Sequence, residues 1–385
     1  MVINKHIMRS TNKKLVMQQV INEGPISRSQ ISRNLDLNKV TVSDIYNYLL
    51  KAGFIREVGH GGSSENGGRR PVLGELNTNR YFVISLHLTA NKVMLLASRL
   101  NAQQLGGDEF ITTDMSLTAV LDETTRRLQT VIAQQKHIQL AGISVAVNGT
   151  VAQNRIVTPA IPGLANFDVA KYFTDQFHVP VVVENSTNLA TVYERDFYGQ
   201  GLFHNLIVLQ VGEHIRAGVV TNDQLYTGHN GHAGEVGQGY LVDRHNHDHL
   251  GAADDYATQT AFMKAIYRQM PTLTLDEAVA AYKHKDAAVL AAGDDFAYYL
   301  ARVITNLTTS FAPDAVILNG LLFTKLPQLL PVIRTHVAAM MNTEPGPILV
   351  TQAVRSATLL GATSLIIHQV LGLETLALNF ASIKS

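Results

Sequence analysis

The stretch SRSQISRNLDLNKVTVS, residues 27–43, contains two helix starts separated by a short turn. Ser27 stands three residues before Gln30, the spacing of a capping box, so a helix is predicted to begin there and to end near residue 34. Asn38 is a favourable N-cap for a second helix. The buried side of that second helix is formed by apolar residues at helical spacing, Val42, Ile45 and Leu49. The stretch therefore predicts two helices joined by a tight turn.

The sequence on either side of this stretch completes a small domain. Apolar residues within positions 12–23 recur every three or four residues, and Gly24–Pro25 stops that pattern. Downstream, residues 54–58 and 71–76 are predicted as short strands joined by a glycine-rich loop. Helices followed by such a hairpin are the pattern of a winged helix-turn-helix domain, predicted here over residues 1–78.

A domain of this kind places its last helix in the major groove of DNA. Its loop ends in Arg69–Arg70, and guanidinium groups favour the narrow minor groove of A·T-rich DNA. On the last helix, Lys39 and Tyr46 are predicted to hold phosphates, and Thr41 and Ser43 to reach base edges. The predicted DNA-contacting residues are Ser27, Arg28, Lys39, Val40, Thr41, Ser43, Tyr46, Gly68, Arg69 and Arg70. The alternative is a solvated helix face that binds no DNA.

Charge and composition agree with a basic module joined to an acidic one. Residues 1–80 hold 12 Lys and Arg against 6 Asp and Glu, whereas the remainder holds 19 against 25, although chance clustering would give the same picture. The chain contains no cysteine, which excludes disulfides, thiolate zinc sites and a cysteine nucleophile. It has no apolar run of about 18 residues, so neither a membrane span nor a secretory signal is expected and a cytoplasmic location is predicted.

Several motifs resemble the ROK family (repressor, open reading frame, kinase). Residues 27–28, 38–43 and 67–71 are similar to its repressor branch, and the likeness continues far beyond residue 80. The later motifs are Val183–Asn185, Ala217–Val219 and the Gly-Glu-Val-Gly of residues 234–237. The resemblance implies an actin-like, two-lobed α/β domain of the sugar-kinase type over residues 79–385, behind the winged helix. Lobe 1 would span about 79–200 plus the C-terminal helix, and lobe 2 about 201–370.

Apolar runs support a mixed α/β fold independently of the resemblance. They alternate with helical stretches, which is typical of sheets covered on both faces. The runs are residues 142–147, 179–183, 206–211 and 315–318.

Three departures from the family pattern predict binding without catalysis. The first phosphate loop of the family, Asp-x-Gly-Gly-Thr, corresponds here to residues 87–91, which lack the carboxylate and both glycines. The second, Gly-Thr-Gly-x-Gly, corresponds to residues 212–216, where Glu213 adds bulk and negative charge. The family's catalytic Asn-Asp pair is Asn185–Ser186, and a serine cannot act as the general base. We therefore expect no kinase activity and no nucleotide cofactor.

The sugar-binding positions of the family survive better. Asn185 and Ser186 can hydrogen-bond hydroxyls, Glu235 keeps the family's carboxylate, Asp254 stands where the family has a glutamate, and Gln238 replaces a histidine. The predicted sugar-binding residues are Gly149, Asn166, Asn185, Ser186, Glu235, Gln238 and Asp254. The alternative for each is a structural hydrogen bond within a loop.

The zinc motif of the family is absent. Family members carry Cys-x-Cys-Gly-x-x-Gly-Cys after the sugar glutamate, whereas residues 242–250 contain no cysteine. Alternate histidines at His245, His247 and His249 could bind a metal. The favoured interpretation is a solvated loop that binds none.

Together these observations predict a sugar-responsive transcriptional repressor. The subgroup most similar in length and wing sequence is that of the xylose repressors of Gram-positive bacteria, which implies xylose as effector, with another sugar or none as alternatives. Sugar would close the cleft between the lobes and change the spacing of paired winged helices in a homodimer, with a tetramer left open. Rival classes are an active sugar kinase with a DNA-binding appendage and an effector-independent DNA-binding or scaffold protein.

Overall fold

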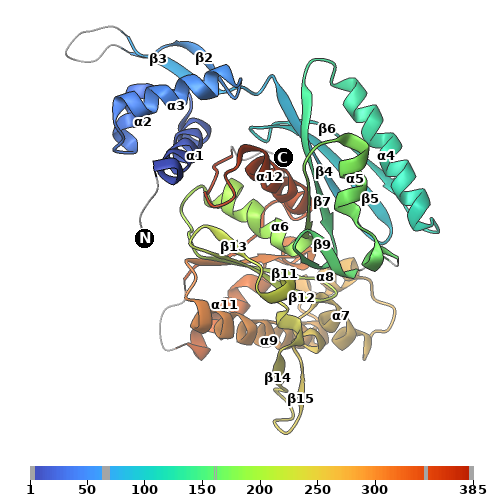
Figure 1. Cartoon of the computed structure of the whole chain (residues 1–385). Coiled ribbons are helices and arrows are strands. Elements are labelled where there is room, and N and C mark those ends of the chain that lie inside the picture. Colours follow the sequence, from blue (N-terminus) through green and yellow to red (C-terminus); the bar gives the residue numbers. More distant parts are fainter. Residues whose placement is uncertain (1–4, 63–69, 160, 162, 342–345, 381–385) are drawn as a thin grey trace. The chain divides into compact units, whose positions relative to one another are not determined.

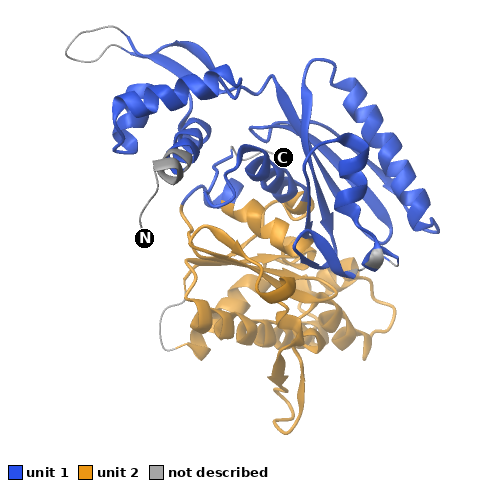
Figure 2. Ribbon diagram, in the orientation of Figure 1, with its two compact units in different colours: residues 1–185, 196–201, 359–385 blue, residues 186–195, 202–358 orange. Residues whose placement is uncertain are grey.

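The computed structural model describes residues 5–62, 70–159, 161, 163–341 and 346–380. Two compact units divide the chain, and Figure 2 colours them. Unit 1 comprises residues 1–185, 196–201 and 359–385, and unit 2 comprises residues 186–195 and 202–358. None of the helices among the described residues is both long and apolar enough to span a bilayer.

The first part of unit 1 contains three helices and a small antiparallel sheet (Figure 1). The helices are α1 (Lys5–Glu23), α2 (Arg28–Asn34) and α3 (Lys39–Lys51), and the sheet has the order β1 (Ile26–Ser27), β3 (Val72–Leu76), β2 (Ile55–His60). The predicted starts of both inner helices are confirmed, since Ser27 Oγ accepts from the Gln30 amide (3.2 Å) and Asn38 Oδ1 from the Val40 amide (2.8 Å). Helix α1 is longer than predicted. It begins at Lys5, upstream of the predicted residues 12–23.

The rest of unit 1 is built on a five-stranded mixed sheet of order β10-β7-β4-β5-β6. Its strands are β4 (Tyr81–Leu88), β5 (Lys92–Arg99), β6 (Gln104–Ile111), β7 (Gln139–Val147) and β10 (Val181–Asn185). β4, β7 and β10 run parallel, whereas β5 and β6 are antiparallel to their neighbours. A hairpin of β8 (Gly149–Ala152) and β9 (Arg155–Pro159) follows β7, and a 3-10 turn, η1 (Leu164–Asn166), comes after it.

Helices cover both faces of this sheet. α4 (Leu117–Gln134) and α5 (Val169–Phe177) pack on one face through a core that includes Phe82 and Phe173. α12 (Ala357–Leu371) lies on the other face, as Figure 1 shows. There Ser85 Oγ bonds Thr363 Oγ1 at 2.8 Å, and Gly142 leaves room for Ile366, which a Cβ at residue 142 would meet at 2.7 Å. The alternation of Phe82 and Ser85 toward opposite helices follows from the two-residue period of a strand.

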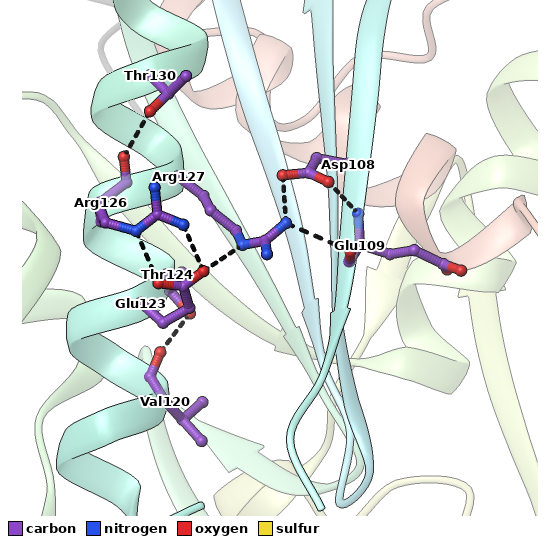
Figure 3. A network of polar contacts seen from close by, with 8 residues as sticks. All are labelled: Asp108, Glu109, Val120, Glu123, Thr124, Arg126, Arg127 and Thr130. Atoms are coloured by element: carbon purple, nitrogen blue, oxygen red, sulfur yellow. Dashed lines mark hydrogen bonds and ion pairs between the residues drawn. The ribbon is translucent and has the colours of Figure 1, made fainter.

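Polar contacts fasten α4 to the sheet edge (Figure 3). The Arg127 guanidinium lies 2.7 Å from Asp108 on β6 and 2.7 Å from Glu123 one turn earlier on α4. Hydrogen bonds from Arg126 and Arg127 lower the pKa of Glu123 to about 2. The charged groups stay near solvent, so their role is to orient α4 on β6 more than to stabilise the fold.

Unit 2 contains a second mixed sheet, of order β13-β12-β11-β16-β17. Its strands are β11 (Leu206–Val211), β12 (Ile215–Thr221), β13 (Gln224–Tyr226), β16 (Ala315–Asn319) and β17 (Ile348–Val350). Its helices are α6 (Ser186–Tyr193), α7 (Gln259–Tyr267), α8 (Leu275–Lys283), α9 (Ala287–Phe311), α10 (Leu321–Lys325) and α11 (Leu329–Met340). A hairpin of β14 (Tyr240–Val242) and β15 (Leu250–Ala252) projects from it.

The α/β prediction is confirmed by these two sheets. All four apolar runs singled out in the sequence are strands, β7, β10, β11 and β16, and each pairs in parallel with another strand of its sheet. Such strands are buried on both faces, which is why they lack polar alternation. Unit 2 buries its own core around the 25-residue helix α9, including Phe262, Phe296 and Ile304.

Candidate functional site

The N-terminal end of α3 presents residues predicted to contact DNA. Lys39 and Val40 are exposed, Val40 to 68%, and Thr41 and Ser43 are half-buried. An exposed valine beside short hydroxyl side chains suits apolar contact with a thymine methyl group. Arg70 is exposed just before β3. Two further predicted contacts, Gly68 and Arg69, lie outside the described residues.

The prediction for Tyr46 is wrong. Its side chain is fully buried, because position 46 lies four residues after Val42 and three before Leu49 and so belongs to the inner face of α3. It fills the space above Gly74, where a Cβ would stand 1.9 Å from the tyrosine hydroxyl. Burial also raises the pKa of Tyr46. Tyr46 therefore stabilises the domain and does not hold a phosphate.

Ser27 and Arg28 are also engaged inside the domain. The Ser27 hydroxyl is buried, caps α2 and lies 3.0 Å from Ser29 Oγ, so its predicted DNA contact is replaced by a capping role. The Arg28 guanidinium lies 4.4 Å from the centre of the Tyr46 ring and 3.2 Å from Glu57 Oε1. Arg28 remains near the surface, and its contact with DNA stays a prediction.

In unit 1, the turn that corresponds to the first phosphate loop is held closed by hydrogen bonds between its own residues. Thr89 Oγ1 donates to the carbonyl of Lys92 (2.8 Å), and the Thr89 amide bonds the same carbonyl (3.0 Å). His87, where the family has a carboxylate, is half-buried and lies 3.3 Å from Asn148 Oδ1. Burial lowers the pKa of His87, which favours the neutral imidazole. The turn offers no carboxylate to a magnesium ion.

Three predicted sugar-binding residues lie in unit 1. Gly149, with φ of +125°, is the first residue of β8, and Asn185 ends β10. Asn154 positions that strand, since its side chain bonds the carbonyl of Val181 (3.0 Å) and the amide of Val183. Asn166 lies in the turn η1.

In unit 2, the turn that corresponds to the second phosphate loop is a tight hairpin turn between β11 and β12. Val211 pairs with Ile215, and the Gly212 amide bonds the carbonyl of His214 at 3.1 Å. Asp254 closes this turn from the η5 segment (Ala253–Asp255). Its Oδ1 accepts from the Ile215 amide (2.8 Å) and its Oδ2 lies 2.7 Å from His214 Nδ1. Asp254 thus holds the start of β12, which favours a structural role over the predicted sugar contact.

Glu235 and Arg216 form an ion pair beside this turn. Arg216 Nε lies 3.4 Å from Glu235 Oε2, and the two side chains are 30% and 20% exposed. Glu235 is held by Gly234, whose carbonyl accepts from Ala217 (2.8 Å) and where any Cβ would stand 1.7 Å from the Ala217 oxygen. Gln238 follows in η4 (Val236–Gln238) and is exposed. Arg216 was not among the predicted residues, although an arginine in place of the loop's last glycine could have indicated it.

Ser186 is the first residue of α6, and its neighbour Thr187 contacts β11. Thr187 Oγ1 donates to Gln210 Oε1, and Gln210 pairs directly with Arg216 across β11 and β12. α6 lies close on β12, because a Cβ at Gly218 would stand 1.9 Å from Thr191 Oγ1. Of the predicted residues of unit 2, Glu235 and Asp254 therefore contact the first residues of β12, Ser186 begins the helix that packs on this strand, and Gln238 is exposed nearby in the chain.

The loop between β14 and β15 is fastened to α9 by charged groups. Arg244 Nη1 lies 2.7 Å from Asp294 Oδ2 and 3.1 Å from Asp295 Oδ1. His245 Nε2 lies 2.9 Å from Asp295 Oδ2, and the Arg244 amide donates to Tyr299 Oη (2.6 Å). Residues 245–250, including His245, His247 and His249, are exposed, as the interpretation of a solvated loop expected, whereas Arg244 is half-buried. Across the described residues, no group of three His, Asp or Glu side chains has the geometry of a metal site.

Replacing Arg244 by alanine is expected to lower the free energy of unfolding by about 1–2 kcal/mol, because two carboxylates of α9 then lose their shared partner near the surface. Urea titration measures the effect. Arg155→Ala is the matched control, since Arg155 is 77% exposed and lies 3.6 Å from Asp168, and it should change stability by less than about 0.5 kcal/mol. Equal effects of the two substitutions would contradict the fastening role.

The two sheets, each covered by helices, and the polar residues gathered at β12 define an α/β protein of the sugar-kinase type. The sequence profile of the ROK family matches residues 83–369, and the chain belongs to the ROK family. It is 33% identical to a xylose repressor of Staphylococcus xylosus over 96% of this chain and 97% of that protein.

Solved structures show the same fold. A ROK family transcriptional regulator, described as a homolog of the E. coli MLC protein, has a TM-score of 0.81 at 18% identity over 95% of this chain and 98% of that one. A ROK hexokinase from Thermus thermophilus has a TM-score of 0.62 at 20% identity over 74% of this chain and 97% of that one. The repressor and regulator matches extend over nearly the whole chain, and the hexokinase match over about three quarters of it.

Proposed function

We propose that the protein is a sugar-responsive transcriptional repressor that does not phosphorylate its sugar. Residues 1–78 form a winged helix-turn-helix domain that binds operator DNA, and residues 79–385 form the sugar-sensing domain. The proposal rests on one chain that joins an exposed α3 end to a kinase-type domain with altered phosphate turns. The first turn lacks the family's carboxylate and both glycines, and the second carries Glu213. Near-full-length similarity to a xylose repressor supports the repressor assignment and makes xylose the first candidate effector.

The C-terminal segment offers a route for the signal within unit 1. Asp196 is buried and its Oδ2 lies 2.9 Å from His368 Nε2, while its backbone carbonyl accepts from the Phe380 amide at 2.8 Å. The segment before Phe380 contacts α1, where Gln18 Nε2 donates to the Ala377 carbonyl at 2.7 Å. Asp196 continues the chain from α6, whose first residue is Ser186. Within unit 1, a shift of Asp196 would thus reach α1 through hydrogen-bonded groups of the C-terminal segment.

Coupling between sugar and DNA provides the test. If sugar favours a state that fits the operator less well, saturating xylose should weaken operator binding about 5- to 150-fold, and operator DNA should weaken xylose binding by the same factor. Titration of xylose into the protein–operator complex, followed by fluorescence anisotropy, measures both. If neither xylose nor any of a panel of other monosaccharides changes operator affinity, sugar control of DNA binding is contradicted.

An active kinase is the second candidate, supported by the structural match to a ROK hexokinase. It would release ADP from ATP in the presence of a hexose or pentose. A coupled ADP assay over the same sugar panel separates the two, and steady turnover dependent on sugar would establish the kinase. Sugar binding without turnover would support the repressor.

Lys39→Ala is expected to weaken binding to every DNA sequence alike, because an exposed lysine at this end of α3 contacts a phosphate and no base. The slope of log Kd against log salt should fall by about 0.9, the contribution of one phosphate contact. Lys51→Ala is the control, since Lys51 is exposed at the other end of α3, and it should leave the slope unchanged. A sequence-specific loss with an unchanged slope would instead place Lys39 against a base.

A further inference from the structure

Arg216 occupies an unusual place for a charged side chain. It stands where the family's second phosphate loop has a glycine, and it lies in β12 between strongly buried neighbours, Ile215 and Ala217. Alternation along the strand sends its side chain to the face that Gln210 and Gly218 share, and α6 packs on that face. Arg216 therefore lies between the start of α6 and Glu235, all within unit 2.

The contacts of Arg216 point to a role with a ligand. Its Nε is buried, lies 3.4 Å from Glu235 Oε2, and has no hydrogen-bond acceptor aligned with it among the described residues. A buried N–H without an aligned acceptor is unfavourable unless a further group completes the arrangement. The neighbouring Gln210 is already engaged by Thr187. The pair thus combines a carboxylate acceptor with a planar set of donors at one end of the predicted sugar site.

We propose that Arg216 is a specificity-determining residue of the effector site, which acts with Glu235 on two adjacent hydroxyls of a neutral sugar. Glu235 accepts from one hydroxyl, and the Arg216 guanidinium donates to the oxygen of the next and holds the Glu235 carboxylate in place. This inference rests on the proposed sugar-sensing function. A neutral ligand is favoured because Glu235 balances the charge of Arg216 and would repel a sugar phosphate.

Arg216→Met, which keeps the length of the side chain but removes its charge and donors, tests the proposal. Calorimetric titration of the full-length protein with xylose should show affinity reduced about 10- to 100-fold, the effect of losing hydrogen bonds to a charged group. Arg216→Lys should recover part of that loss. Operator affinity without sugar should not change. Arg302→Met is the matched control, because Arg302 is another half-buried arginine of unit 2 with a buried Nε, and it should leave xylose affinity unchanged.

The affinity for monodeoxy xyloses distinguishes a direct contact between Arg216 and the sugar from a merely structural role. In the wild-type protein, removal of the hydroxyl that Arg216 contacts should weaken binding, and in Arg216→Met the same removal should have no further effect. Equal losses in both proteins at every hydroxyl would overturn the inference while leaving sugar sensing intact. Tighter binding of xylose 5-phosphate than of xylose, lost in Arg216→Met, would overturn the assignment to a neutral sugar. Failure of the wild-type protein to bind any sugar in the panel would overturn the proposed function itself.

Discussion

Glu235→Ala is expected to abolish the response to sugar while leaving operator binding intact. The Glu235 carboxylate is mostly buried beside β12, and its loss removes charge-assisted hydrogen bonds to sugar hydroxyls. Two such bonds correspond to about 3 kcal/mol or more, hence at least a 100-fold loss of sugar affinity. In a thermal-shift titration with xylose, the wild-type protein should gain stability with concentration, and Glu235→Ala should not.

The control for this variant must also remove a carboxylate. Asp248→Ala is suitable, because Asp248 is exposed in the loop between β14 and β15. It should retain the xylose-dependent shift in full. Operator binding by Glu235→Ala without sugar should match that of the wild-type protein, so that xylose no longer releases the DNA. A variant that still responds to xylose would place the sugar elsewhere, and a variant that loses operator binding would show that Glu235 supports the fold.

The sequence correctly predicted local structure at positions where one short-range interaction determines it. The caps Ser27 and Asn38 set the starts of α2 and α3, and the apolar runs became buried parallel strands. Tyr46 was misplaced because its hydroxyl suggested an outward face, whereas its spacing from Val42 and Leu49 places it inside. Tyrosine joins an apolar ring to a polar tip, so residue type alone does not tell which end decides its position.

The spacing of the predicted sugar-binding residues in the sequence could not show which of them have structural roles. Glu235 and Asp254 are both carboxylates, but the oxygens of Asp254 are engaged by Ile215 and His214, whereas Glu235 faces Arg216. This difference arises from the approach of η5 to the turn between β11 and β12, a tertiary contact with no sequence signature. The anchoring of Arg244 on α9 is of the same kind, because its partners lie about fifty residues later in the chain.

Glu194→Gln is expected to stabilise the protein at alkaline pH. Glu194 is 1% exposed and directly follows α6 in unit 2, and its Oε1 has no hydrogen-bond partner among the described residues. Burial raises its pKa from 4.5 to about 7, and the neighbouring Thr351 hydroxyl offsets only part of that rise. The ionised carboxylate is therefore disfavoured in the folded protein, whereas a neutral glutamine of the same size carries no such penalty.

The pH dependence of this effect follows from the direction of the shift. Below about pH 4.5 Glu194 is protonated in both the folded and the unfolded chain, and it contributes no pH dependence. Between pH 4.5 and 7 the unfolded chain loses the proton while the folded protein keeps it, so wild-type stability falls as pH rises. Above about pH 7 both states are ionised and the loss is complete, at about 3 kcal/mol.

Urea unfolding of both proteins from pH 4.5 to 8.5 measures this difference directly. The advantage of Glu194→Gln over the wild-type protein should grow by about 3 kcal/mol across that range and should level off above pH 7 to 8, because every other titrating group is common to both proteins and cancels. Glu213→Gln serves as the matched control, since it makes the same substitution at a residue that is exposed in the turn between β11 and β12. A constant difference for Glu194→Gln would mean that Glu194 is ionised in the folded protein throughout. Its carboxylate would then have a partner that compensates for burial, and residue 194 would be no source of pH sensitivity.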